Sequence, residues 1–185
     1  MIQYLCVALL CIFIPFSISL LSDGMIGPGR WLVINIQKCP DWQKYPIRID
    51  IVRRKVNRTH DGFSGFMELD MDFDDHYSVR MDICKHVDGG CKPYQLLTDH
   101  SGCNFIEKYA KENVKDCLAA SGLNESCPIP KGKHVINNYV FNYEELPGNS
   151  IYGLFGVKIQ TFEKSQEISC VDMTISFEAK RDDDE

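Results

Sequence analysis

The sequence predicts an all-β protein in which two antiparallel sheets form a sandwich or cup, with one amphipathic helix and disulfide staples. Three observations predict this class. Apolar and polar residues alternate along most of the chain, one stretch has helical spacing instead, and most of the nine cysteines follow an apolar N-terminus.

The N-terminal segment has the composition of a secretory signal peptide. Residues 1–19 carry no charge and are dominated by large apolar side chains. Ser17 and Ser19 supply the small residues that signal peptidase needs, so we expect cleavage after Ser19, with Ser22 as the alternative. A transmembrane anchor fits less well, because Pro15 interrupts the apolar run and no Lys/Arg cluster flanks it. We therefore expect a secreted, extracellular protein.

The mature chain is long enough for a single domain. We expect residues 20–180 to form one domain with a buried core. Residues 181–185 are charged and have nothing to bury, so we expect a disordered acidic tail.

Surface features exclude one class of partner. The net charge of −6 disfavours nucleic acid. We interpret the basic run at residues 53–55 as a solvated loop rather than a heparin or lipid-headgroup patch. Asn57 and Asn124 each begin an Asn-X-Ser/Thr triplet, which makes them candidate glycosylation sites.

Short strands are predicted by alternation at period two and by β-rich composition. In the last of them, four apolar residues alternate with Asp172, Thr174 and Ser176, as in a half-buried strand with one wet face. Seven or eight such strands imply a sandwich or a cup. The candidate strands cover residues 31–37, 47–51, 69–73, 79–83, 134–143, 151–162 and 171–177.

One segment has helical periodicity. Over residues 104–118 apolar residues recur at helical spacing, and Glu and Lys occupy the other face. Ser101 is placed to cap this helix and Gly122 to end it. Its apolar face could cover the open mouth of the two sheets or simply pack against one of them.

The cysteines predict disulfides with one thiol left over. Two of them would leave with the signal peptide, and the odd number that remains leaves one unpaired or intermolecular. In an oxidising compartment the other six should form three bridges, but spacing does not choose among the pairings. A Cys84–Cys91 link would close a short turn, and a Cys39–Cys170 link would tie the first strand to the last. The seven are Cys39, Cys84, Cys91, Cys103, Cys117, Cys127 and Cys170.

Several landmarks follow one another in an order that resembles a known family. They are Cys84 with Cys91 seven positions later, a helical stretch after Cys103, Cys127-Pro128 with Gly132 beyond it, Glu145-Leu146-Pro147, and Cys170 before a final alternating strand. In this order they resemble the ganglioside activator family of the ML lipid-recognition superfamily. A Trp-led strand before Cys39 is most similar to its insect branch, the chemosensory protein B type.

The resemblance implies a fold, a set of bridges and a ligand class. The fold would be a β-cup, in which two splayed sheets surround an apolar cavity for acyl chains or other hydrophobes. Cys117 would stay unpaired, because the chain lacks, near Glu125, a cysteine of the fourth bridge found in the vertebrate activators. The implied bridges are Cys39–Cys170, Cys84–Cys91 and Cys103–Cys127.

A cavity of this kind would be lined by inward-facing strand residues. Each methylene buried there contributes about 0.8 kcal/mol, and no catalytic group is needed. Any of these residues could instead belong to an ordinary packed core, because alternation does not separate core from cavity. The candidate lining residues are Ile49, Ile51, Leu69, Met71, Phe73, Val79, Met81, Phe141, Leu154, Val157, Ile159, Met173, Ile175 and Phe177.

Signals for chemistry are weak. Asp70, Asp72 and Asp74 imitate the start of a calcium loop, but the required Gly is Asp75 and the closing Glu is Met81.

Other catalytic or metal patterns are also incomplete. Residues 62–65 fall short of a nucleophile elbow, and the histidines lack zinc-site spacing. The free thiol of Cys117 would be inert if buried. We therefore expect no metal, no cofactor and no enzymatic activity.

The sequence thus favours a secreted, non-enzymatic carrier or presenter of a small hydrophobic ligand. By resemblance that ligand would be a cuticular hydrocarbon or a lipid pheromone. One alternative is an extracellular accessory protein that contacts a membrane receptor or channel, and another is immune recognition of microbial lipid. A secreted hydrolase would have to use Cys117 or Ser64.

Overall fold

The computed structural model describes residues 25–55 and 61–180. The predicted signal peptide, the sequon at Asn57 and the acidic tail lie outside the described residues. The described chain forms two α-helices, two short 3-10 helices (η1, Trp42–Lys44, and η2, Tyr143–Glu145) and nine strands. The strands are β1 (Ile26–Lys38), β2 (Ile47–Lys55), β3 (Asp61–Leu69), β4 (Ser78–Val87), β5 (Gly90–Asp99), β6 (Gly132–Val140), β7 (Asn149–Ile151), β8 (Gly153–Glu163) and β9 (Gln166–Ala179).

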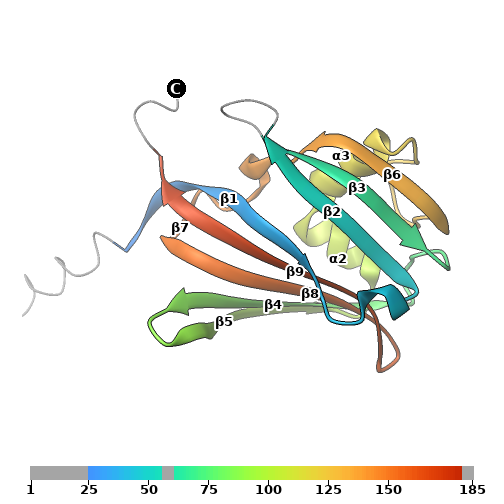
Figure 1. Cartoon of the computed structure of the whole chain (residues 1–185), viewed down its shortest axis with the longest axis horizontal. Helices are drawn as coiled ribbons and strands as arrows, with labels where there is room; N and C mark the ends of the chain where they lie inside the picture. The colour runs from blue at the N-terminus through green and yellow to red at the C-terminus, as the bar shows by residue number, and fades with distance from the viewer. Residues whose placement is uncertain (1–24, 56–60, 181–185) are drawn as a thin grey trace, which may run out of the picture.

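The strands form two antiparallel sheets, which confirms the predicted fold class. The larger sheet has the order β5-β4-β8-β9-β1-β7, and the smaller has the order β2-β3-β6. Both consist of antiparallel pairs. The smaller sheet stands over one end of the larger one and leaves its other end uncovered (Figure 1). The two ends of the larger sheet therefore have different surroundings.

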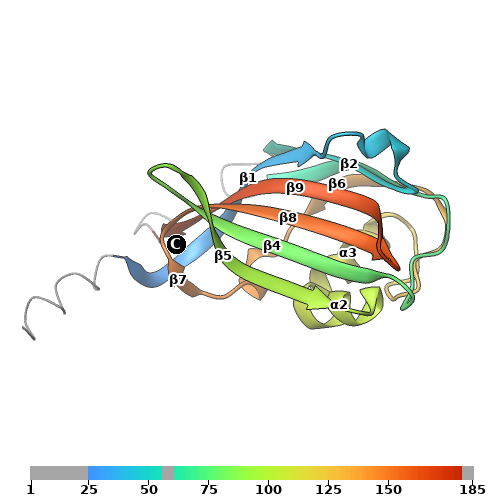
Figure 2. The same cartoon turned by 90° about the horizontal axis from the view of Figure 1, so that it is seen from below.

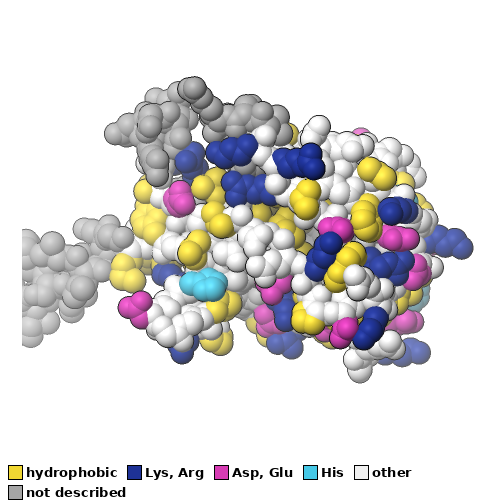
Figure 3. Space-filling model, viewed as in Figure 1, with side chains coloured by type: hydrophobic (Ala, Val, Ile, Leu, Met, Phe, Trp, Pro, Cys, Tyr) yellow, Lys and Arg dark blue, Asp and Glu magenta, His cyan; other side chains and the backbone are white. Residues whose placement is uncertain are grey.

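Along one side, the smaller sheet is tied directly to the larger one. Lys38 at the end of β1 donates to Asp50 of β2 across 2.7 Å. The guanidinium of Arg53 donates to the carbonyls of Val33 and Ile34 in β1. Lys and Arg side chains gather over the region where β1 and β2 meet (Figure 3). The prediction of a solvated loop at residues 53–55 is wrong, because they are the last residues of β2.

Along the other side, two helices span the gap between the sheets. The helices are α2 (Gly102–Tyr109), which contacts β4 and β5, and α3 (Lys111–Ala120), which contacts β6. Both lie at the end covered by the smaller sheet (Figure 2). The backbone N–H of Asn104 donates to Ser101 Oγ across 3.0 Å, as the cap prediction requires.

The prediction of a single helix is wrong. Ala110 leaves the helical conformation with φ −152° and ψ 26°, and α3 starts at the next residue. This break lets α2 stay beside the edge of the larger sheet while α3 turns to the edge strand of the smaller one. Gly122, with φ +72°, follows the end of α3 as predicted.

Three strands, β3, β5 and the three-residue β7, were not predicted as separate strands, and one predicted strand is absent. The alternating residues 69–73 are not a strand, because β3 ends at Leu69 and the chain then makes only an isolated bridge between Phe73 and Ile129. β3 itself was missed because glycines interrupt its pattern. At Gly65 a Cβ would lie 1.9 Å from the Asp50 carbonyl oxygen, so the close approach of β2 and β3 requires glycine. β5 was missed because most of its residues are exposed.

All three bridges implied by the resemblance are present. The Cα–Cα distances are 5.8 Å for Cys39–Cys170, 5.4 Å for Cys84–Cys91 and 5.7 Å for Cys103–Cys127. Among the described residues Cys117 is the free cysteine, as expected. No helix of the described chain is long and apolar enough to cross a membrane.

Aromatic rings pack over the uncovered end of the larger sheet. Phe155 and Phe177 are 0% and 1% exposed. The Trp31 ring lies 5.5 Å from Phe155 and 4.8 Å from Phe177, between centroids. Tyr94 and Tyr152 complete this aromatic cluster at 5.3 Å from Phe155 and 5.5 Å from Phe177. This end of the sheet is a packed core.

Candidate functional site

The covered end of the larger sheet encloses a cavity of about 340 Å³. Its walls come from β2, β3 and β6 on one side, from β4, β8 and β9 on the other, and from α2 and α3. Its lining contains no Asp, Glu, Lys, Arg or His. A hollow of this size and character is typical of a small-molecule site.

The structure brings eight of the predicted lining residues together around this cavity. Most of them come from facing strands of the two sheets, as two opposed alternating patterns would place them. They are Ile49, Ile51, Leu69, Phe73, Val79, Met81, Phe141 and Ile159.

Four other predicted residues face the same way but at the packed end. Phe177, Ile175 and Met173 pair in register with Gly153, Phe155 and Val157 of β8. Residues paired across antiparallel strands share a face, so these side chains lie on the inner face of the sheet. They are not part of the cavity lining, and the prediction that Val157, Met173, Ile175 and Phe177 line it is wrong.

The remaining two predicted lining residues, Leu154 and Met71, do not lie on an inward-facing strand position beside the cavity. Leu154 is 45% exposed, because it alternates with the inward-facing Phe155 and Val157 and so lies on the outer face of β8. Met71 follows the end of β3 and packs against the edge of the core, outside the cavity lining.

The helices and several polar residues supply lining that the strand pattern did not predict. The apolar face of α2 and α3 borders the cavity, so the helices complete its wall. The helical periodicity of residues 104–118 identifies this face, but not that it borders a hollow. The additional lining residues are Ile47, Met67, Phe105, Ile106, Ala110, Asn113, Val114, Cys117, Leu118, Ile129, Ile136, Tyr139, Thr161 and Ser169.

Asn113 fixes α3 against the smaller sheet. It is 4% exposed, and its side-chain amide donates to the Asn142 carbonyl at 3.0 Å and to Glu145 Oε2 at 2.6 Å. Its oxygen accepts from the Tyr139 hydroxyl at 2.6 Å and from the Asn142 N–H at 2.8 Å. All four hydrogen-bonding positions of the amide are occupied, so Asn113 positions the wall and offers nothing to a ligand.

The ionisable groups of the lining are neutral at physiological pH. Burial raises the pKa of the Cys117 thiol to about 11. Burial also raises the pKa of Tyr139, and the nearby Cys117, Asp116 and Glu145 add to this shift. A thiol with so high a pKa has almost no thiolate at pH 7 and is a poor nucleophile.

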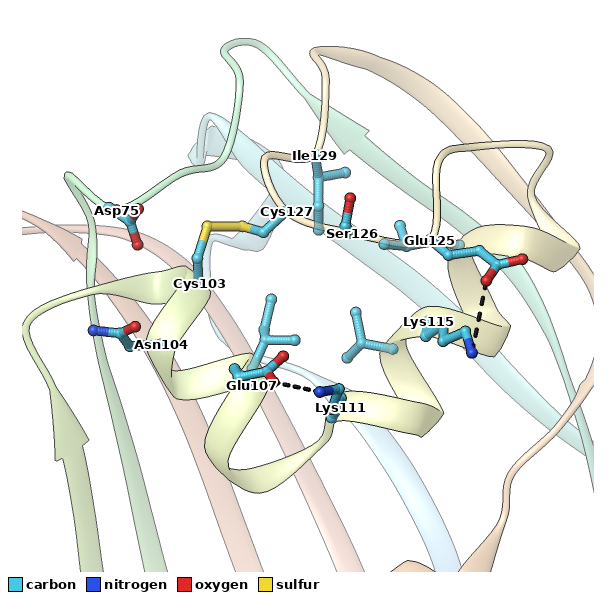
Figure 4. A pocket seen from close by; sticks show the side chains of 13 residues that line it. Asp75, Cys103, Asn104, Glu107, Lys111, Lys115, Glu125, Ser126, Cys127 and Ile129 are labelled. Atoms are coloured by element: carbon cyan, nitrogen blue, oxygen red, sulfur yellow. Dashed lines mark hydrogen bonds and ion pairs between the residues drawn. A yellow bond between two sulfur atoms is a disulfide. The ribbon is translucent and has the colours of Figure 1, made fainter.

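A second hollow, of about 330 Å³, lies on the solvent side of the helices. Its rim carries Glu107 paired with Lys111, and Lys115 paired with Glu125 (Figure 4). It shares four apolar lining residues with the inner cavity. These are Ile106, Val114, Leu118 and Ile129, so the helical wall between the two spaces is one layer of side chains thick.

The residues considered for metal binding or nucleophilic chemistry have structural partners instead. Asp70 forms a two-point ion pair with Arg48, at 2.7 and 2.9 Å, and Asp72 accepts from the Lys131 N–H. Ser64 lies in β3 and bonds to Asn138 across a bulge. Within the described chain, no cluster of three His, Cys, Asp or Glu residues could hold a metal ion.

No family model matches the chain, and no curated protein matches it.

Proposed function

We propose that the protein is a secreted, non-catalytic carrier or presenter of a small hydrophobic ligand. The observation that carries this proposal is the cavity of about 340 Å³ between the two sheets, with no charged side chain in its lining. Apolar surface of this kind gains free energy when a hydrophobic ligand displaces water from it.

The size of the cavity sets the scale of the ligand. With about 30 Å³ for each water-sized group, a cavity of about 340 Å³ holds on the order of ten heavy atoms. Ten buried methylenes contribute about 8 kcal/mol before the costs of ordering are subtracted. A longer chain would extend out of the mouth. An affinity weaker than about 1 μM is expected for a simple ten-carbon ligand.

Secretion and family membership belong to the same proposal. Disulfides form and persist in oxidising compartments, and the three bridges support export of the chain. Their pairing is the one implied by the resemblance to the ganglioside activator family, and this agreement supports membership of the ML superfamily. On that basis the ligand is a pheromone-like lipid or hydrocarbon, and the role is in chemosensation.

A fluorescent hydrophobic probe tests the proposal. The naphthyl group of N-phenyl-1-naphthylamine has ten carbons and should occupy the cavity, with the phenyl ring in the mouth, so wild-type protein should bind this probe with a large rise in emission. Ile49→Trp places a large ring in the cavity and should reduce probe binding at least tenfold. Leu154→Trp adds the same ring on the outer face of β8 and should leave binding unchanged.

Failure of the probe to bind folded wild-type protein, or equal binding by the Ile49→Trp variant, would contradict the proposal. Unfolding curves for both variants show whether each is folded. An empty protein that still binds an extracellular receptor or channel would favour the accessory-protein alternative.

A further inference from the structure

Two hydroxyl side chains lie next to each other on the cavity floor. Thr161 of β8 and Ser169 of β9 are partners in the antiparallel register. Both line the cavity, and they are only 8% and 4% exposed. Directly paired residues of this kind have Cβ atoms about 5 Å apart, so one small polar group can reach both hydroxyls.

Neither hydroxyl has a protein partner within residues 25–55 and 61–180. Neither oxygen is sealed inside the protein without a partner, so each still borders open space, which the cavity provides. A buried hydroxyl without a hydrogen bond is unfavourable. The pair therefore needs a partner from outside the chain, either water or a polar group of the ligand.

The other polar groups of the lining do not compete for this role. The side chain of Asn113 has all its hydrogen bonds filled, and the Tyr139 hydroxyl donates its proton to Asn113. The thiol of Cys117 is a weak donor. Within the described lining, Thr161 and Ser169 are the hydroxyls that have both donor and acceptor capacity to spare.

The pair lies at the enclosed end of the cavity. Ser169 is flanked by Ile168, 1% exposed, and by Cys170, which is bonded to Cys39. The Tyr45 hydroxyl donates to Glu167 at 2.6 Å and ties the start of β2 to the same stretch of β9. Along β2, Ile47 is buried, whereas the following lining residues, Ile49 and Ile51, are only half-buried.

We propose that Thr161 and Ser169 bind the polar end of a ligand that carries one small uncharged oxygen group, such as an alcohol, a ketone or an ester. The hydrocarbon tail then extends toward Ile51 and Phe141, so the ligand enters with its polar end first. A carboxylate or phosphate is disfavoured because no cation lines the cavity. This inference rests on the proposed function and narrows its ligand class.

Competition against N-phenyl-1-naphthylamine tests the inference with nonan-1-ol and nonane as the competing ligands. Wild-type protein should bind nonan-1-ol at least tenfold more tightly than the Thr161→Val/Ser169→Ala variant does. The affinity of that variant gives the contribution of the carbon chain alone. The double variant should lose about tenfold in affinity for nonan-1-ol and keep its affinity for nonane, because only the hydrogen bonds are removed. Thr174→Val, on the outer face of β9, is the matched control and should bind both ligands as wild type does.

The outcomes separate this inference from the proposed function. Unchanged affinity of the double variant for nonan-1-ol, with probe and nonane still bound, would overturn the polar-end inference and leave the carrier proposal intact. Failure of wild-type protein to bind the probe or either ligand would overturn both. The single variants Thr161→Val and Ser169→Ala provide the same comparison if the double variant does not fold.

Discussion

Strand β8 passes from a packed region to a hollow one along a single face of the sheet. Phe155 is fully buried against Trp31 and Tyr94, with ring centroids 5.5 and 5.3 Å away. Ile159, four residues later on the same face, borders the cavity. At the first position aromatic rings lie directly on the sheet, whereas at the second the opposing wall is the smaller sheet, held away by α2 and α3. The opposite wall, not the strand itself, decides between core and cavity.

The two ends also differ in the length of chain that their disulfides close. Cys39–Cys170 lies at the enclosed end of the cavity and spans 131 positions, whereas Cys84–Cys91 spans 7 and lies beside Gly156 near the aromatic cluster.

Removing the long bridge should have the largest effect. By chain entropy, Cys39→Ala/Cys170→Ala should lower the free energy of unfolding by about 5 kcal/mol, and Cys84→Ala/Cys91→Ala by about 2.5 kcal/mol. Urea denaturation of the two double variants measures the difference. Equal losses would mean that strain or local packing at the bridges outweighs loop length.

Enlarging one valine at each end tests packing directly. Val79 and Val157 are 6% and 4% exposed on neighbouring strands, but only Val79 lines the cavity. Val157→Phe should lower the free energy of unfolding by about 1–3 kcal/mol, because the packed end has no room for the ring. Val79→Phe should cost less than about 1 kcal/mol, because the ring can enter the hollow.

Thermal or urea unfolding of these two variants checks the comparison, and probe binding adds a second readout. Val79→Phe should lower the affinity for the probe, whereas Val157→Phe should leave that affinity unchanged. A larger stability loss at Val79 than at Val157 would mean that the cavity is not open space.

The smallest effect concerns the thiol in the cavity wall. The raised pKa of Cys117, about 11, means that the folded protein favours the neutral thiol, and its thiolate forms only as the pH rises toward that value. Alkylation by iodoacetamide at pH 8 should therefore be about 100-fold slower than for an ordinary thiol, and it should rise about tenfold per pH unit up to about pH 11. Because Cys117 lines the cavity, bound nonan-1-ol should slow its alkylation further at every pH. A rate like that of a free thiol would show that Cys117 is not buried.

The alternation of apolar and polar residues along the sequence identified most of the strands and many of the residues on the inner faces of the two sheets. The clean pattern at residues 171–177 predicted an inward row of β9, and extending it two residues back reaches Ser169. Ser169 was missed because the predicted strand began at residue 171, whereas β9 begins at Gln166. A similar extension from Ile159 reaches Thr161. The assignment of Leu154 to the cavity lining was wrong, because it relied on the apolar side chain and not on the position of Leu154 in the alternation.

Other features could not be read from local pattern. The break at Ala110 depends on where the edges of the two sheets lie, and the bond between Asn113 and Glu145 joins segments far apart in sequence. β3 was hidden by Gly62 and Gly65, and Gly65 is required by the close approach of β2 and lies next to a bulge. Whether an inward row meets a packed wall or an open space is set by tertiary structure, so sequence alone could not separate the two ends.

Native mass spectrometry of protein secreted from insect cells tests most directly whether the hollow holds a hydrophobic ligand. Spectra recorded before and after addition of nonan-1-ol should show one bound hydrophobic molecule per wild-type chain, and none on the Ile49→Trp variant. Wild-type protein that carries no organic-extractable compound, and that gains no adduct with added nonan-1-ol, would contradict the account.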